Sequence, residues 1–458
     1  MRIESTDHLD HPFADVAAWH RRPGALVRLT PPGLATIDRP AEGGLDVGRR
    51  VSVHLGPGML PTGRPRWTLR HAALAEHDDA LRFEDRQVTG PFRLWHHVHE
   101  LRGDGSGTTV RDTIEAEAPG GGRVADAALA DQVRRTLTFR TEQLRDDLDL
   151  HARYADAPRL TVAIAGASGL IGTQLAALLE TGGHRVRRMV RGREAGEGEI
   201  SWDPQRGVLD PADLEGVDAV VNLAGRSIAT RMTPEAKQEI LSSRVSSSEL
   251  ISRTIAGMSD GPRVLVQASA IGYYGAQRPG ELLTEGDLGG DDVLAQVCRA
   301  WESSTRRAAE AGVRTVHLRT GIVLSDGGGA LLPQLPLFLL GLGGRLAPPD
   351  AVSSWITLDD MVRSYAHALL TADLAGPVNA VAPHPATARE LASTLGRVLH
   401  RPAVVPVPAA GPALLLGREG ARELVRADQR VSDATLRDSG FEAAYPELEG
   451  ALRHVLRR

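Results

Sequence analysis

The chain has 458 residues, of which 42% are hydrophobic and 24% are charged, and its formal net charge is −5. This length predicts two or three domains, and the acidic balance argues against a nucleic-acid-binding protein. One cysteine excludes an internal disulfide framework, and neither a signal core nor an apolar stretch long enough to span a membrane is evident, so we expect a cytoplasmic protein without a membrane partner.

The first 155 residues predict several short strands followed by one long helix. The strands alternate apolar and polar residues, which is typical of an antiparallel sheet with one solvated face. The helix carries Val133, Leu137, Leu144 and Leu148 at helical spacing. The predicted strands are 2–7, 49–55, 66–75, 80–86, 92–101 and 108–116, and the predicted helices are 13–19 and 124–154.

This order of elements resembles the START/polyketide-cyclase-like (SRPBCC) superfamily, as do the stretch 19–25 (WHRRPGA) and Pro31-Pro32. The resemblance implies an α+β helix-grip domain over residues 1–155, in which a curved sheet wraps a helix around an apolar cavity. An apolar ligand is therefore expected in this N-terminal domain.

Three histidines on one predicted strand raise the question of a metal site. His97 and His99 would share one face of the strand and His96 would take the other. No cysteine or carboxylate pair completes a site nearby in the sequence, and two histidines alone rarely hold a metal. We interpret them as polar residues on a sheet face and predict no metal site.

The stretch 162–172 (VAIAGASGLIG) carries the strongest functional signal. A buried strand leads into three glycines and then a helix, which together form a cradle for phosphate at the helix N-terminus. Gly166 permits a tight turn, Gly169 lets the backbone approach a pyrophosphate, and Gly172 lets the helix lie close to the strand. The predicted cofactor-binding residues here are Gly166, Ser168, Gly169, Leu170, Ile171 and Gly172.

The second strand of this unit, 185–190, ends in Arg191-Gly192-Arg193. NAD-selective proteins normally place Asp or Glu near this point to hold the ribose hydroxyls. A guanidinium instead suits a 2′-phosphate, which a carboxylate would repel. The sequence therefore predicts NADP as the cofactor, with Arg191 as its 2′-phosphate ligand.

Residues 160–458 resemble the extended short-chain dehydrogenase/reductases, in particular their NAD-dependent epimerase family with a C-terminal DUF1731-like region. The supporting motifs follow one another along the chain: 166–172 (GASGLIG), 202–204 (WDP), 222–225 (NLAG), 243–245 (SRV), 269–275 (SAIGYYG), 297–302 (VCRAWE), 318–321 (LRTG) and 354–360 (SWITLDD). The resemblance implies an α/β Rossmann doubly wound parallel sheet with a small C-terminal substrate lobe, to which residues 377–458 contribute. We assign the strand 378–381, the helix 388–399 and a core or cavity-wall role for Leu414-Leu415-Leu416 to that lobe.

The same resemblance implies further cofactor contacts. Leu223 and Ala224 would line the cofactor with backbone atoms, beside Gly225. Glu239 and Arg244 would face it from the side, and Val323 would approach its nicotinamide end.

The predicted catalytic residues depart from the family pattern. Hydride-transferring relatives use a Ser and a Tyr-x-x-x-Lys pair, in which Tyr exchanges the proton. Ser269 matches the serine, whereas the helix over 292–299 contains neither Tyr nor Lys. Tyr273 and Tyr274 lie beside Ser269, and either donates the proton or packs structurally. Cys298 has no His-bearing motif beside it and is expected to pack in a helix.

These observations lead to two hypotheses. The first is an NADP-dependent oxidoreductase or epimerase-like enzyme that acts on an unidentified small molecule, and the retained Ser269 favours it. The alternative is a catalytically inactive NADP-binding scaffold or sensor with a ligand-binding N-terminal module, which the missing Tyr-Lys pair favours.

Overall fold

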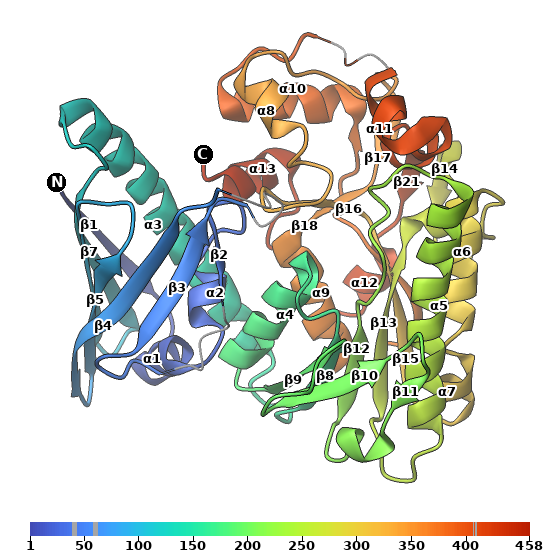
Figure 1. Ribbon diagram of the computed structural model, residues 1–458, viewed down its shortest axis with the longest axis horizontal. Helices are drawn as coiled ribbons and strands as arrows, with labels where there is room; N and C mark the ends of the chain where they lie inside the picture. The colour runs from blue at the N-terminus through green and yellow to red at the C-terminus, as the bar shows by residue number, and fades with distance from the viewer. Residues whose placement is uncertain (39–43, 58–62, 406, 408–409) are drawn as a thin grey trace.

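The computed structural model describes residues 1–38, 44–57, 63–405, 407 and 410–458, and two β-sheets organise it (Figure 1). The N-terminal sheet is antiparallel, with strand order β1-β7-β6-β5-β4-β3-β2. Its strands are β1 (Arg2–Leu9), β2 (Ala35–Ile37), β3 (Arg50–Leu55), β4 (Arg66–His77), β5 (Ala80–Thr89), β6 (Leu94–Gly103) and β7 (Thr108–Glu117). Its helices are α1 (Phe13–Arg21), α2 (Ala25–Arg28) and the long α3 (Arg123–Arg153).

The predicted strands and helices of this part are confirmed, apart from the short β2 and α2, which have no clear sequence pattern. α3 buries the predicted stripe of Val133, Leu137, Leu144 and Leu148. Segment 154–160 then leads, without helix or strand, to the second sheet, as the linker over 155–159 predicts.

The second sheet has the strand order β11-β10-β9-β8-β12-β13-β15-β19 and is parallel except for β11. The order from β10 to β15 is the 3-2-1-4-5-6 order of the Rossmann fold, so this prediction is confirmed. The strands are β8 (Thr161–Ala165), β9 (Arg185–Val190), β10 (Glu199–Asp203), β11 (Val208–Leu209), β12 (Ala219–Asn222), β13 (Val264–Ala270), β15 (Arg314–Thr320) and β19 (Gly376–Ala380).

Helices cover both faces of this sheet, which explains why its strands read as nearly continuous apolar runs. α4 (Leu170–Thr181) and α9 (Leu358–Leu370) share one core with Val162, Ile164 and Val221. α5 (Pro234–Ala256) and α7 (Arg306–Glu310) pack on the opposite face. The remaining helices beside the sheet are α6 (Val293–Ser303) and α12 (Ala434–Asp438).

Two predictions for the C-terminal region are wrong. The strand at 376–380 is β19, which extends the main sheet beside β15 because Val378 and Ala380 are buried in the sheet core. Leu414 and Leu415 are 73% and 74% exposed rather than core, since α11 (Ala410–Gly420) turns Leu416 and Gly420 toward Met232 instead.

A small helical core forms a C-terminal lobe. α8 (Leu335–Leu339), α10 (Ala388–Leu399) and α13 (Leu448–Leu456) share it. Short strand pairs connect the lobe to the sheet: β14 (Gln277–Leu283) with β21 (Asp428–Val431), β16 (Ile322–Leu324) with β18 (Trp355–Thr357), and β17 (Val352–Ser353) with β20 (Ala386–Thr387). No helix among the described residues is both long and apolar enough to cross a membrane.

The N-terminal part packs directly on α4, the helix that follows the glycine turn (Figure 1). At this interface Arg28 of α2 is 1% exposed. Its guanidinium donates to Asp147 of α3 at 2.8 and 3.0 Å, to Asp359 of α9 at 3.0 Å and to the Gln174 side chain of α4 at 2.9 Å. A buried charge is tolerated only when it is paired in this way, so the two parts are joined by a specific polar contact.

Candidate functional site

The glycine turn lies at the carboxyl end of β8, where the strand order reverses and where open α/β sheets bind their ligands. Gly166 has φ +82°, and a Cβ there would lie 2.9 Å from the backbone of Leu223. A Cβ on Gly172 would lie 2.2 Å from the Gly166 carbonyl oxygen. These two glycines therefore serve the tight turn and the close helix, as the sequence predicts.

Gly169 differs from its two neighbours because its surroundings are open. The nearest atom to a Cβ there would be the Gly166 carbonyl oxygen, 3.3 Å away, and both Ser168 and Gly169 are exposed. Gly169 caps α4, whose first turn contains no acidic residue. The first amides of a helix lack intrahelical acceptors and attract anions, so this turn fits a pyrophosphate, with Leu170 and Ile171 half-buried beside it.

Arg191 follows β9 at the same edge of the sheet. Its side chain is exposed and makes no hydrogen bond or ion pair with any residue that the structure describes. Arg193, by contrast, is held by Glu199 at 2.5 and 2.6 Å. Arg191 is thus the arginine of this strand end that is available to an anionic ligand.

The loop after β12 lies against the glycine turn, with Leu223 half-buried, Ala224 buried and Gly225 exposed. Arg244 packs on this loop: its guanidinium donates to the Arg226 carbonyl at 2.9 Å and lies 4.8 Å from the Trp301 ring centroid.

Two further predicted cofactor contacts lie near these loops. Glu239 is exposed and paired with Arg226, so it lies at the rim of the site. Val323 is half-buried on β16, and the loop that follows it lies over α4, where a Cβ on Gly328 would lie 3.1 Å from Leu170.

The predicted catalytic serine belongs to a buried network of hydrogen-bonded side chains: Ser269, Glu302, Arg319, Tyr274 and Asn379. Ser269, at the end of β13, is 3% exposed and donates to Glu302 at 2.7 Å. Arg319, opposite it on β15, donates to both Glu302 oxygens at 2.9 Å and to the Tyr274 hydroxyl at 3.0 Å. Tyr274 in turn donates to Asn379 at 2.7 Å.

The two tyrosines have different environments. Tyr274 is fully buried, and burial, which the Arg319 guanidinium only partly offsets, raises its pKa to about 12. Tyr273 is half-buried, with the Arg319 guanidinium 3.5 Å from its ring centroid, and its hydroxyl has no hydrogen-bond partner among the described residues. The geometry therefore brings Tyr273, rather than Tyr274, to a position where its hydroxyl is free to exchange a proton.

Sequence reasoning missed the roles of Glu302, Arg319 and Asn379. All three lie far from Ser269 in the chain, although Glu302 and Arg319 stand inside motifs that carry the family resemblance. Cys298 is buried, and burial together with the neighbouring Glu302 raises its pKa to about 12, which agrees with packing.

A second candidate site lies in the N-terminal part. A cavity of about 920 Å³ lies between the strands β3 to β7 and α3. His97 and His99 share its wall, whereas His96 lies on the other face of the sheet against Glu84, as the strand alternation predicts. Sequence reasoning missed Asp112 on the neighbouring strand, whose carboxylate lies within 4.8 Å of ring nitrogens of His97 and His99.

Comparisons with known proteins agree with the Rossmann-like fold of the second sheet. Residues 162–329 match the NAD dependent epimerase/dehydratase family, and residues 407–455 match a domain of unknown function, DUF1731. An epimerase family protein of Mycobacterium bovis is 40% identical over 298 residues, which cover 65% of this chain and 98% of that protein.

Two solved structures extend the comparison. A nucleoside-diphosphate sugar epimerase from Corynebacterium glutamicum is 31% identical, with a TM-score of 0.81, and the match covers 99% of this chain and 90% of that one. Human epimerase family protein SDR39U1, solved with NADPH, is 32% identical with a TM-score of 0.59, over 65% of this chain and 99% of that one.

Proposed function

Because the chain belongs to the NAD dependent epimerase/dehydratase family, we propose that residues 160–458 form an NADP-dependent oxidoreductase or epimerase-like enzyme that acts on a small molecule. The observation that carries this proposal is the combination of an open glycine turn with an unpaired Arg191 at the neighbouring strand end. The NADPH in the structure of the human relative supports the same cofactor.

Different residues of the site would bind different parts of the cofactor. The glycine turn and the first turn of α4 would hold the pyrophosphate, and Arg191 would hold the 2′-phosphate through a charge-assisted contact. The loop from Leu223 to Gly225, with Arg244 behind it, would form the opposite wall. A cofactor held in this way would supply a hydride for an acceptor carbon of the substrate.

Proton exchange falls to Tyr273 in this proposal. Its hydroxyl has no partner among the described side chains, and the ring is fixed beneath Arg319. Ser269 and Tyr274 act differently, because each donates its proton within the buried network, Ser269 to Glu302 and Tyr274 to Asn379. They would hold Arg319, and through it Tyr273, in place.

The same buried network of hydrogen-bonded side chains favours a second function. With the serine hydroxyl engaged and no Tyr-Lys pair on the helix over 292–299, the site also fits an NADP-binding scaffold or sensor that does not catalyse. The proposal of an enzyme is kept as the first because Tyr273 leaves one hydroxyl free.

For the N-terminal part, we propose the helix-grip fold of the START/polyketide-cyclase-like superfamily over residues 1–155. The seven-stranded antiparallel sheet, the long α3 and the cavity between them support this assignment. We also propose that the protein is cytoplasmic.

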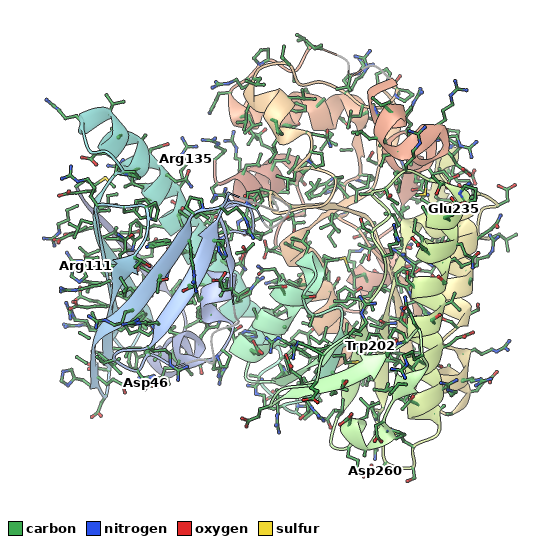
Figure 2. The ribbon with its side chains drawn as sticks, viewed as in Figure 1. Asp46, Arg111, Arg135, Trp202, Glu235 and Asp260 are labelled. Carbon is green, nitrogen blue, oxygen red and sulfur yellow. The ribbon has the colours of Figure 1, made fainter. Side chains whose placement is uncertain are left out.

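The cofactor is tested by calorimetric titration with NADPH and NADH. Loss of one charge-assisted contact corresponds to about ten-fold or more in affinity, so Arg191→Ala should weaken NADPH by that factor and leave NADH nearly unchanged. Arg263→Ala is the matched control, since Arg263 is 88% exposed beside Asp260, a labelled residue at the end of the sheet far from the C-terminal lobe (Figure 2). Equal losses for both cofactors in Arg191→Ala would contradict the assignment.

Catalysis is tested by NADPH oxidation with phenanthrenequinone as the probe acceptor. General acid help is worth about 10²–10⁴-fold, so Tyr273→Phe should lower kcat by that order while NADPH affinity and thermal stability are retained. Tyr274→Phe should instead lower thermal stability, because it removes a buried donor to Asn379. If the wild-type protein binds NADPH without turnover, the scaffold is the better account.

A further inference from the structure

The N-terminal cavity has an apolar region large enough for an organic ligand. Its volume of about 920 Å³ is in the range of pockets that enclose drug-sized molecules. Trp67, Phe92 and Trp95 form an aromatic cluster in its wall, with ring centroids 4.8 to 5.2 Å apart. Ile114 and Leu137 add aliphatic surface from β7 and α3.

A row of polar side chains crosses the same wall. The strand register places His71, Asp85, His97, His99 and Asp112 on adjacent strands from β4 to β7. One oxygen of Asp112 accepts from His97 Nε2 and from His99 Nδ1, each at 2.7 Å. Asp85 lies 2.6 Å from His71 Nδ1 and 3.4 Å from His99 Nε2. Both carboxylates are therefore already paired with imidazoles.

The charge states within the row follow from these contacts. Burial opposes the charged form of His99, but Asp112 and Asp85 outweigh burial and raise its pKa. Burial and the charge of His99 lower the pKa of His97 to about 4, so His97 is neutral near pH 7. The two carboxylates thus pair with imidazoles of neighbouring strands and lie near one further cation, Arg140 of α3.

Arg50 also lacks a partner but is exposed, whereas Arg140 is a half-buried cation of the cavity without a direct partner among the described residues. It stands on α3, lines the cavity and is half-buried. Asp112 and Asp85 act on it only through space, and it makes no hydrogen bond or ion pair within the described part of the chain. A desolvated guanidinium without a hydrogen-bonded anion is costly, which indicates that the anion comes from outside the chain.

We propose that this cavity binds an amphipathic carboxylic acid, with its carboxylate on Arg140 and its apolar body among Trp67, Phe92 and Trp95. A monoanion fits better than a phosphate, because only Arg140 is both half-buried and unpaired among the described lining residues, and two carboxylates, Asp112 and Asp85, lie nearby. A metal ion fits this wall less well than a network of hydrogen bonds, since His97 and His99 already bond to the same Asp112 oxygen. This site is separate from the proposed nucleotide-binding site and does not depend on the proposed enzymatic activity.

The test is calorimetric titration of the full chain, without NADPH and in the presence of EDTA. Three acids are compared with their alcohols: decanoate with decanol, naphthylacetate with naphthylethanol, and anthracenecarboxylate with anthracenemethanol. At least one acid should bind with a stoichiometry of one and about ten-fold or more tightly than its alcohol. If none of the three acids binds more tightly than its alcohol, the proposal is wrong.

Variants of cavity residues test where the acid binds. Arg140→Met should remove the preference for the acid and leave the alcohol unaffected, whereas Arg134→Met, at an exposed position of the same helix, should behave as the wild type. Val133→Trp, which fills the cavity, should weaken acid and alcohol alike. Should Arg140→Met lose its cooperative thermal transition, Arg140→Gln and Arg140→Lys give the same comparison, with only Lys keeping the preference.

Three results would overturn the proposal. The acid preference could survive in Arg140→Met, which would place the carboxylate elsewhere. Binding could be unchanged in Val133→Trp, which would place it outside the cavity. Acid binding could also require added Zn²⁺ and vanish in EDTA, in which case His97, His99 and Asp112 hold a metal that receives the ligand.

Discussion

The buried Arg28 at the interface between the two parts allows a quantitative test of what joins them. We predict that Arg28→Met strongly destabilises the protein, although methionine fills much of the same space. The substitution leaves Asp147, whose side chain is 0% exposed, and Asp359, which is 13% exposed, without their guanidinium partner. Removing one partner of a buried ion pair costs about 3–5 kcal/mol, because the remaining charge stays in a medium of low polarity.

The size of the effect in a melting experiment follows from the size of the folding unit. For units of roughly 150–250 residues, 1 kcal/mol corresponds to about 2–4 °C, so Arg28→Met should lower Tm by about 6–20 °C. Arg111→Met is the control: its pair with Glu4 is 46% and 39% exposed and stands on the side of the N-terminal sheet away from the interface (Figure 2). Exposed pairs contribute about 0–1 kcal/mol.

The assay is thermal unfolding followed by circular dichroism and tryptophan fluorescence. The double variant Arg28→Met/Asp147→Leu should recover part of the loss, because replacing both charges by apolar groups removes the unpaired carboxylate. If Arg28→Met melts within about 2 °C of the wild type, a shift that corresponds to roughly 1 kcal/mol or less, the contact contributes no more than an exposed ion pair and the reasoning fails.

Three further predictions follow from other contacts. Burial opposes the charged form of His454, but hydrogen bonds to two carboxylates, one of them Asp359, raise its pKa to about 9. The contribution of protonated His454 to the free energy of unfolding is therefore fully present below pH 6.5 and is lost as the pH rises through 9. Over this window the free energy of unfolding, measured by urea titration, should fall by about 3 kcal/mol more in the wild type than in His454→Gln. Gly169→Ala should weaken NADPH in calorimetry without lowering Tm, whereas Gly172→Ala should lower Tm as well, since its Cβ would lie 2.2 Å from a backbone oxygen; equal effects would contradict the roles given to these glycines. Residues 1–155 expressed alone should unfold cooperatively and bind an apolar probe, and a fragment without a thermal transition would refute this.

Local patterns predict most of the elements and their order. Alternation along the N-terminal strands and the glycine spacing at 166–172 depend on neighbouring residues, so the sequence alone is sufficient for them. The same alternation places His97 and His99 on one face of β6. The alternation does not predict that Asp112 lies beside these histidines, because the residue opposite each position depends on the register of β6 and β7, which the sequence does not show.

The residues that sequence reasoning missed are joined over long separations. Ser269 meets Glu302, and Tyr274 meets Asn379, only after the parallel strands align. The sequence makes Tyr274 a catalytic candidate because it stands inside the motif 269–275, and its full burial and its hydrogen bond to Asn379 distinguish it from Tyr273. The prediction for Leu414 is wrong because a run of apolar residues indicates burial from the sequence alone. In the structure, α11 leaves the Leu414 side chain exposed.

The helix α13 and the residues just after it make contacts that involve the N-terminal part. On α13, His454 bonds to Asp359 and to Glu142 of α3, and Arg457 just beyond it pairs with Asp326, which also accepts the Gly33 amide. The contacts with Glu142 and Asp326 join α13 and Arg457 to segments that stand more than one hundred residues earlier in the sequence. Removing residues 448–458 would therefore take away contacts of α3 and, through Asp326, of the segment around Gly33 in the N-terminal part.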